Sequence, residues 1–375
     1  MHIYWFTGRS MKDLCSTTQT SLASGLIERG YDLTFVNSDP ELSHEKWPWQ
    51  HCSMEISTFP GRRSHSLGQN MKRWLRNKTL PKEAFALVDW RIAHILIPEF
   101  RKQKLPWILI DRSPPADKGL LSLLQWPSWK RSWKRVREEN SGHGCVVSLK
   151  HREFVKNKTG VKLSQITVLP AGVNLEQFRM EERYDTLTMV YHGQLDQHRG
   201  VLALPMLLQK ARAAGIDIQL ILIGQGDCVD GLQAMAKTNE HMTVHSTLEQ
   251  DKLAKILSQC HIGLLPMPVR KMWTISSPLK RSEYAASGLL MFGIDHDGHR
   301  FSGDEELNWM KLVDQSDFHD EGVKWLQSLE QSHIETLALQ SRKYAEEHLS
   351  WTHSVEALET SIPVSYTHLT LPTKA

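Results

Sequence analysis

Short apolar segments alternate with longer amphipathic segments along this chain, and this alternation restricts the fold more than any other feature. The apolar segments have the length and composition of strands, and the amphipathic segments have helical periodicity. Strands are predicted at 2–6, 33–36, 85–88, 107–110, 145–148 and 166–169, and again at 187–193, 218–224, 242–246, 261–266 and 289–292. Helices are predicted at 11–29, 229–237, 249–259 and 278–287, and in the residues before 214. Strands that alternate with helices form parallel sheets. We therefore expect an α/β chain with two doubly wound, Rossmann-like halves.

The boundary between the halves is predicted in a polar stretch at 174–186, where the apolar periodicity lapses and charged residues gather. This boundary gives an N-terminal domain at 1–178, a second domain at 187–345 and a further helix at 346–362. Residues 363–375 lack periodicity and resemble translated sequencing-adapter read-through, so we predict that they are a non-native tail.

Composition argues against several classes of protein. A formal net charge of +3 gives no reason to expect a nucleic-acid binder, and no apolar run reaches the length of a membrane span. The cysteines are far apart and favour neither a disulfide framework nor a zinc site; they are Cys15, Cys52, Cys145, Cys228 and Cys260. His296 and His299 form a compact pair without a third ligand, so no metal is expected. Because the N-terminus has no signal-peptide pattern, we expect a cytoplasmic protein.

The start of the predicted helix at 278–287 has the features of an anion site. Ser277 is a suitable N-cap, Pro278 fits the first helical position and Gly288 can end the helix. The free N–H groups of such a helix start attract anions, and Lys280 adds a positive charge in the first turn. Glu283 lies on the same helix face and could accept hydrogen bonds from hydroxyl groups. The alternative is that Lys280 and Glu283 form an ordinary ion pair on a solvated surface.

Two glycine turns follow strands of the second half, where a parallel sheet binds its ligand. The first turn contains Gly193, Gln194, Arg199 and Gly200, and its arginine could bind a phosphate oxygen with two hydrogen bonds. The second contains Gly224 and Gly226, which would let the backbone approach a ring or a diphosphate. Taken alone, each turn is more often only a tight connection between elements.

Five segments together resemble the family 4 glycosyltransferases, which are retaining enzymes with the GT-B fold. The segments are VVSLKHREF (146–154), LPAGVNLEQF (169–178), GQLDQHRG (193–200), LIGQGD (222–227) and SPLKRSEYAASGLLM (277–291), within a match that covers about residues 1–362. The resemblance implies two Rossmann-like domains that face each other across a cleft. The first would bind the acceptor and the second a nucleoside-diphosphate sugar, and the C-terminal helix would return to the first domain.

The resemblance also implies roles for single residues. Arg199 and Lys280 would hold the donor diphosphate and stabilise it as a leaving group, and Glu283 would bind the ribose hydroxyls. The loop before Ser277, with Ser276, would contact the sugar. Other donor contacts would come from Gly8, Gly193, Gln194, Gly200, Gly224, Gly226, Ser277, Pro278 and Leu279. In this family the acceptor hydroxyl attacks from the leaving-group face, so no protein nucleophile, cofactor or metal is implied.

Four features depart from the family pattern. Asn174 stands where an aspartate is usual, and Gly8 stands alone where the family has a glycine pair. Gln194 stands where an arginine is usual, and Ile275 stands where many members have a glutamate that contacts the sugar. These departures keep open an alternative function, a protein that binds a nucleotide sugar without transferring it.

Residues for the acceptor side are predicted in the first half. Asp111 and Arg112 follow the strand at 107–110 and precede a sharp turn, so Asp111 could orient an acceptor hydroxyl and act as a catalytic residue while Arg112 neutralises a phosphate. Arg9, beside Gly8, is a further acceptor-side candidate, and the loop at 87–94 is a weaker one. The alternative is that Asp111 and Arg112 support the turn from within the protein.

The segment at 126–137 forms a predicted helix with tryptophans on one stripe and basic residues around it. Trp129, Lys130, Arg131, Trp133, Lys134 and Arg135 could touch an anionic membrane surface, which would favour a peripheral location and a lipid-linked acceptor. One alternative is that the tryptophans pack in the core and the basic residues are solvated. A more distant alternative is a nucleic-acid binder that uses this helix.

Overall fold

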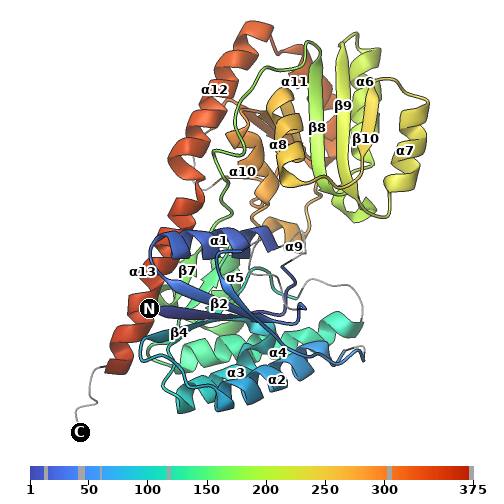
Figure 1. Ribbon diagram of the computed structural model, residues 1–375. Helices are drawn as coiled ribbons and strands as arrows, with labels where there is room; N and C mark the ends of the chain where they lie inside the picture. Colours follow the sequence, from blue (N-terminus) through green and yellow to red (C-terminus); the bar gives the residue numbers. More distant parts are fainter. Residues whose placement is uncertain (12–15, 41–46, 60, 116–119, 302–305, 371–375) are drawn as a thin grey trace. The chain divides into compact units, whose positions relative to one another are not determined.

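The computed structural model describes residues 1–11, 16–40, 47–59, 61–115, 120–301 and 306–370 (Figure 1). The chain divides into two compact units, of which the first is Met1–Pro170 with Trp351–Ala375 and the second is Ala171–Ser350. The division thus falls before the polar stretch at 174–186. Ala171 belongs to the second unit because its backbone is hydrogen-bonded there. Its N–H donates to Ser277 Oγ, and its carbonyl oxygen accepts a hydrogen bond from Ser282 Oγ.

The first unit contains a sheet of parallel strands in the order β3-β2-β1-β4-β5-β6-β7. Their bounds are β1 His2–Phe6, β2 Asp32–Asn37, β3 Gln50–Ser53, β4 Ala84–Asp89, β5 Trp107–Ile110, β6 Gly144–Val146 and β7 Ile166–Val168. The sequence prediction missed only β3 among these strands. This edge strand reads QHCS and is half-buried at most, so it lacks the apolar run that identifies a central strand.

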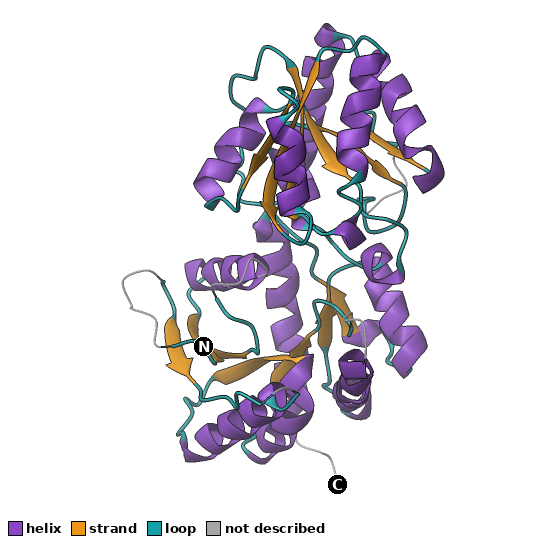
Figure 2. Cartoon of the chain, turned by 90° about the vertical axis from the view of Figure 1, so that its right-hand side faces the viewer, coloured by secondary structure: helices purple, strands orange, loops and turns teal. Residues whose placement is uncertain are grey.

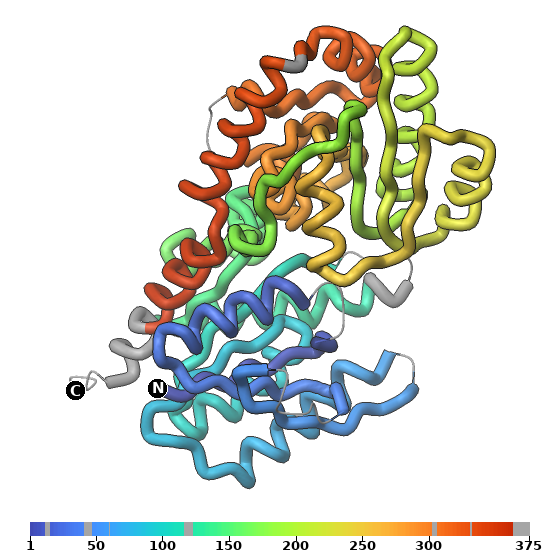
Figure 3. Tube along the Cα trace, turned by 45° about the horizontal axis from the view of Figure 1, so that its top comes forward, coloured from blue at the N-terminus to red at the C-terminus, as the bar shows by residue number. Residues whose placement is uncertain are grey.

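Helices cover both faces of this sheet (Figure 2). One face is covered by α1 (Thr17–Glu28) and α13 (Trp351–Thr370), which pack against each other (Figure 3). The other face is covered by α2 (Arg63–Asn77), α3 (Trp90–Lys102), α4 (Leu120–Glu138) and α5 (Leu149–Thr159). α13 begins after 346 and continues past 362, where the sequence prediction ended it, and residues 371–375 lie outside the described chain.

The second unit contains a parallel sheet in the order β10-β9-β8-β11-β12-β13. The strands are β8 Leu187–Gln194, β9 Ile218–Gln225, β10 Met242–His245, β11 Ile262–Leu265, β12 Leu290–Ile294 and β13 Met310–Val313, of which only β13 was not predicted. The helices are α6 Ala203–Ala213, α7 Val229–Lys237, α8 Gln250–Gln259, α9 Lys271–Thr274, α10 Leu279–Ala286, α11 Phe318–Gln327 and α12 Gln331–His348. The predicted class, two doubly wound Rossmann-like halves, is confirmed.

The start of α10 differs from its prediction in detail. Pro278, with an extended ψ of 128°, takes the N-cap position, and Ser277 lies one residue before it. Ser277 Oγ instead accepts hydrogen bonds from Ala171 N and Arg281 Nη2. Gly288 ends the helix in the left-handed region, as predicted, with φ of 69°. The first N–H groups of α10 are therefore left without a side-chain cap.

Candidate functional site

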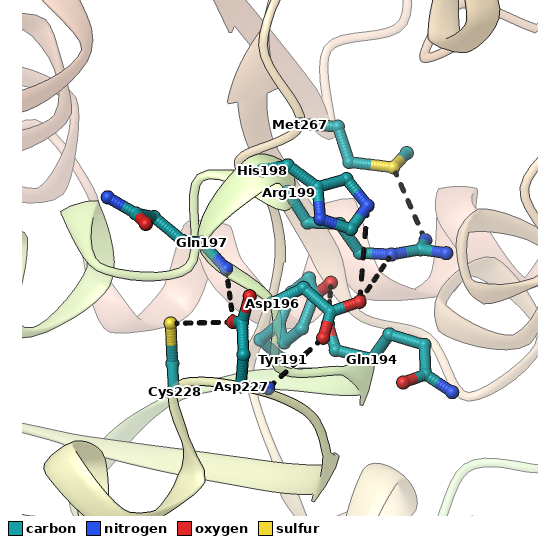
Figure 4. A network of polar contacts seen from close by, with 9 residues as sticks. All are labelled: Tyr191, Gln194, Asp196, Gln197, His198, Arg199, Asp227, Cys228 and Met267. Atoms are coloured by element: carbon teal, nitrogen blue, oxygen red, sulfur yellow. Dashed lines mark hydrogen bonds and ion pairs between the residues drawn. The ribbon is translucent and has the colours of Figure 1, made fainter. Parts of the chain in front are cut away.

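Three connections meet at the carboxyl edge of the second sheet, because β8 lies between β9 and β11. The connection after β8 is joined to the one after β9 through two aspartates (Figure 4). Asp196 Oδ1 accepts a hydrogen bond from the Asp227 N–H at 3.2 Å, and Asp227 Oδ1 accepts one from the Gln197 N–H at 2.8 Å. The two loops are therefore joined into one rim beside β8.

The glycines of these loops allow close packing between loops. A side chain at Gly224 would place its Cβ 1.7 Å from the carbonyl oxygen of Gly193, and one at Gly226 would lie 2.5 Å from the backbone of Leu195. Gly200 has φ of 76° and faces the carbonyl oxygen of Pro266, which follows β11. At Gly224, Gly226 and Gly200 the structure therefore supports the tight-connection alternative.

Replacing Gly224 by alanine should destabilise the second unit by about 2–4 kcal/mol, because the new methyl group would collide with a backbone oxygen at a φ of 150°. The matched control is Gly231→Ala in α7, where nothing lies within 4 Å of the added carbon. We expect the control to stabilise by about 0.5–1 kcal/mol, since alanine favours a helix interior. Urea unfolding of both variants measures the difference, and equal stability of the two would contradict this account.

Lys280 in the first turn of α10 is buried, with 7% of its surface exposed. Its Nζ lies 3.8 Å from the centre of the Tyr191 ring and has no hydrogen-bond acceptor among the described residues. Burial lowers the pKa of Lys280 well below the usual lysine value, and the positive charge of Arg199 lowers it further. Glu283 is also buried, so the alternative of an ion pair on a solvated surface is wrong.

Arg199 lies at the same rim. Its guanidinium carbon is 4.7 Å from the centre of the Trp273 ring, and its Nη1 is 4.0 Å from Met267 Sδ. The nearest carboxylate oxygen, Asp196 Oδ2, is 3.8 Å from Nε and orients the group without a tight hydrogen bond (Figure 4). Arg199 and Lys280 act on each other electrostatically, which places the two predicted cations in one neighbourhood.

Glu283 has a partner that sequence reasoning missed. His192 Nε2 lies 3.1 Å from Glu283 Oε2, and the His192 ring packs edge-on against Tyr284. His192 is buried at the end of β8, directly before Gly193. Its position in the sequence could have identified it as a candidate, because a polar residue at the end of an apolar strand lies at the edge of the sheet where ligands bind.

Trp273 of α9 was also missed. His198 stacks on its ring at 5.8 Å with an angle of 17°, while Arg199 lies over the same indole. The backbone carbonyl of Trp273 accepts hydrogen bonds from the N–H and the hydroxyl of Ser276. Trp273 thus joins the loop expected to contact the sugar to the loop that carries Arg199.

The remaining donor residues predicted in the second half lie around this rim. Pro278 and Leu279 are half-buried at the start of α10, and Gly193 borders Lys280, since an added Cβ would lie 3.5 Å from Nζ. Gln194 is half-buried, and its backbone oxygen accepts a hydrogen bond from the Tyr191 hydroxyl. Ile275 is 8% exposed and brings no polar atom to the loop.

His296 and His299 have structural contacts. Their rings lie 3.8 Å apart; His296 Nε2 is 3.1 Å from the Met267 oxygen and His299 Nδ1 is 2.7 Å from the Ile294 oxygen. Burial lowers the pKa of both imidazoles. Within the described ranges, no group of three or more His, Cys, Asp or Glu side chains is arranged to hold a metal ion.

In the first unit, Asp111 is completely buried. Its Oδ2 accepts hydrogen bonds from Trp129 Nε1 at 2.6 Å and from Trp133 Nε1 at 2.8 Å, and His151 Nε2 lies 3.5 Å away. A carboxylate enclosed in this way does not reach an acceptor, so the predicted catalytic role of Asp111 is wrong. The alternative of a buried support was closer, although the partners are tryptophans of α4 rather than Arg112.

Trp129 and Trp133 are fully buried, so the prediction that they touch a membrane is wrong. Their indole N–H groups need an acceptor in the core, and Asp111 supplies it. Lys130, Arg131 and Lys134 are exposed on the outer side of α4, and Arg135 is half-buried. The sequence predicted that the tryptophans lie on one side of the helix, but it could not predict whether that side faces the core or the solvent.

The acceptor-side candidates Arg9 and Arg112, and the predicted donor residue Gly8, lie in the first unit after β1 and β5, and Asp89 ends β4. Gly8 N–H donates to Asp89 Oδ2 at 3.3 Å, Arg9 N–H donates to Thr7 Oγ1, and Arg112 donates to Thr18 Oγ1 at 2.6 Å. Asp89, in the loop predicted at 87–94, is buried and also accepts the Thr7 hydroxyl at 2.6 Å. Burial raises the pKa of Asp89.

No protein-family model and no curated protein matches this sequence. Solved structures do match along almost the whole chain. The sucrose-phosphate synthase of Thermosynechococcus elongatus has 14% identity and a TM-score of 0.75, with 98% of this chain and 99% of that chain covered. HepE of Anabaena, in complex with UDP and glucose, has 9% identity and a TM-score of 0.72, with 97% and 99% covered. WaaG, a glycosyltransferase involved in lipopolysaccharide biosynthesis, has 12% identity and a TM-score of 0.69, with 96% and 99% covered. The chain therefore has the fold of GT-B glycosyltransferases.

Proposed function

We propose that this chain is a retaining glycosyltransferase that moves a sugar from a nucleoside-diphosphate sugar to an acceptor hydroxyl. The observation that carries the proposal is the buried Lys280 ammonium, which has no acceptor among the described residues and lies at an uncapped helix start near Arg199. A buried lysine whose ammonium has no hydrogen-bond acceptor is costly to keep charged, and the attraction of the Glu283 carboxylate offsets only part of this cost. A diphosphate at this position would supply the missing negative charge.

The same groups would assist the reaction. Breaking the bond from the anomeric carbon to the diphosphate oxygen leaves negative charge on the diphosphate, and prearranged positive groups stabilise that charge. Lys280, Arg199 and the N–H groups at the start of α10 supply them. A divalent metal is not required for this role, so we expect activity to survive EDTA.

Glu283 would bind the ribose. A carboxylate can accept hydrogen bonds from two neighbouring hydroxyl groups, and His192 next to one of its oxygens would fix its orientation. HepE with UDP and glucose and the pneumococcal GtfA with UDP and GlcNAc support uridine nucleotides as the first donors to test.

Retention of the anomeric configuration is proposed from the family resemblance. The acceptor hydroxyl would attack from the side on which the diphosphate leaves, and a diphosphate oxygen would take the hydroxyl proton. No carboxylate is assigned as a nucleophile, and Asp111 is enclosed by its partners. A role in surface glycan or glycolipid assembly is supported by WaaG, which acts in lipopolysaccharide biosynthesis.

The second candidate function is a nucleotide-sugar-binding protein without transfer activity. Gln194 and the buried, apolar Ile275 favour it, because they remove two polar contacts that the family makes with the donor. Both candidates require the same diphosphate site and differ in turnover.

The test is titration of the protein with UDP-glucose, UDP-GlcNAc and other nucleotide sugars in a thermal-shift assay, followed by product analysis. A transferase should bind one donor and slowly hydrolyse it, or transfer it to an added acceptor, and NMR should show the retained anomer. Binding without any turnover would favour the second candidate. No stabilisation by any nucleoside diphosphate or its sugars would contradict both.

A further inference from the structure

Arg199 is held at the rim of the site by an aromatic ring. Its guanidinium carbon lies 4.7 Å from the centre of the Trp273 ring, and the ring of the preceding residue, His198, stacks on the same indole. A cation–π contact is made by the charge as a whole, so it does not require that an N–H bond be directed at an acceptor. An aromatic partner can therefore fix the position of the charge while the N–H groups remain available to a phosphate.

The other contacts of the Arg199 side chain compete only weakly with a phosphate. Its Nη1 lies 4.0 Å from Met267 Sδ, and a thioether sulfur is a weak acceptor. Asp196 Oδ2 is 3.8 Å from Nε, and Nε has no hydrogen-bond partner among the described residues (Figure 4). The aromatic contact with Trp273 is thus the main restraint on the guanidinium.

Arg281, in the same unit, makes a similar ring contact but uses its donors within the protein. Its guanidinium carbon lies 4.8 Å from the centre of the Phe301 ring. Its N–H groups donate to two backbone oxygens and to Ser277 Oγ. Arg281 therefore joins neighbouring loops to each other. The comparison indicates that Arg199, whose charge is held in the same way, keeps its donors for a ligand.

The position of Trp273 is fixed through its backbone. Its carbonyl oxygen accepts hydrogen bonds from the N–H and the hydroxyl of Ser276, at 3.1 and 2.7 Å. Gly298 packs against the same oxygen, since an added Cβ would lie 2.0 Å from it. His296 Nδ1 accepts the Gly298 N–H, which leaves the ring proton on Nε2 to donate to the Met267 oxygen at 3.1 Å. Residues 295–299 thus support the loop that carries both contacts of Arg199.

We propose that Trp273 is a positioning residue that holds Arg199 in the orientation in which it binds the diphosphate of the nucleotide. This rests on the proposed function, because the proposed function assigns Arg199 to that diphosphate. A side chain that is already ordered loses less conformational freedom when the ligand binds, and this raises the affinity. Trp273 therefore contributes to nucleotide affinity through Arg199 and not through a contact of its own.

A double-mutant cycle with UDP as the probe tests this coupling by isothermal titration. Trp273→Leu should weaken UDP binding by about tenfold, the size expected when a cation–π contact is lost in a site shielded from water. Arg199→Met should weaken it by about 30-fold, because the charge itself is removed. In the Arg199→Met background, Trp273→Leu should cause no further loss. An undiminished tenfold loss in that background would overturn the proposal.

Two further comparisons separate positioning from other roles of the indole. Trp273→Phe keeps an aromatic face and should bind UDP within about threefold of the parent, whereas a loss as large as that of Trp273→Leu would contradict the proposal. UDP-glucose should show the same fold-loss as UDP in Trp273→Leu. A larger loss with UDP-glucose would show that the indole contacts the sugar, and would likewise contradict it.

Phe59→Leu is the matched control. Phe59 lies 5.4 Å from the guanidinium carbon of Arg62 in the first unit, so the substitution removes the same kind of contact and should leave UDP binding unchanged. Thermal unfolding checks that each variant is folded, and Trp273→Met replaces Trp273→Leu in the cycle if the leucine variant is not. If the parent protein bound neither UDP nor inorganic pyrophosphate, the proposed function itself would fail. Binding by the parent without coupling between Trp273 and Arg199 would overturn the positioning role alone.

Discussion

Lys280→Met should weaken binding of the nucleoside diphosphate by about 100-fold or more, because a buried charge pair between lysine and phosphate is lost. The unliganded variant should be as stable as the parent or more stable, since the substitution removes an unpaired buried cation and keeps the side-chain volume over Tyr191. Isothermal titration measures the first effect and thermal unfolding the second. Loss of both binding and stability would indicate a damaged fold instead.

The pH dependence gives an independent check on the same lysine. In the free protein the pKa of Lys280 is far below the usual lysine value, and a bound diphosphate would raise it. Binding should therefore take up a proton, and affinity should fall by up to about tenfold per pH unit between the two pKa values. The parent protein should show this decline as the pH rises past the lowered pKa of Lys280, and Lys280→Met should not. An exposed-lysine variant, Lys252→Met, should behave as the parent does.

Without ligand, the same shift makes a prediction for stability. A lysine whose pKa is lowered on folding binds fewer protons in the folded state than in the unfolded state. Its contribution to the free energy of unfolding therefore rises with pH, from the lowered pKa up to the ordinary lysine value. Lys280→Met should remove this rise when the two proteins are compared by urea unfolding.

Asp111→Ala should destabilise the first unit by about 3–5 kcal/mol, because it leaves the buried indole N–H groups of Trp129 and Trp133 without their acceptor. Asp111→Asn should cost less, since its amide oxygen can still accept one of these bonds. Urea unfolding, followed by tryptophan fluorescence, measures both changes. Thr18→Val, which removes one hydrogen-bond acceptor of the neighbouring Arg112, serves as a comparison with a smaller expected cost.

The activity of the asparagine variant distinguishes a structural Asp111 from a catalytic one. A carboxylate that only supports the core should leave turnover per folded molecule nearly unchanged in Asp111→Asn. A drop of 100-fold or more in turnover, with stability preserved, would restore the acceptor role that the buried position argues against.

Sequence alone determined the class of fold, because apolar runs of strand length alternating with amphipathic runs have few solutions other than parallel sheets covered by helices. It also identified the start of α10 as a candidate anion site, because a lysine in the first turn of a helix that follows an apolar strand can be recognised from neighbouring residues alone. The edge strand β3 was missed because its residues are at most half-buried and carry little apolar signal, and β13 because its apolar run is only four residues long and includes a lysine.

Tertiary structure decided what each polar residue does. The sequence could not show that Trp129 and Trp133 turn inward to Asp111, that His192 meets Glu283, or that Trp273 packs against Arg199, because each contact joins residues from separate elements. Nor could it show that the Lys280 ammonium is buried without an acceptor. Periodicity reports which face of an element is apolar, whereas the partner of a buried polar atom depends on how distant elements pack.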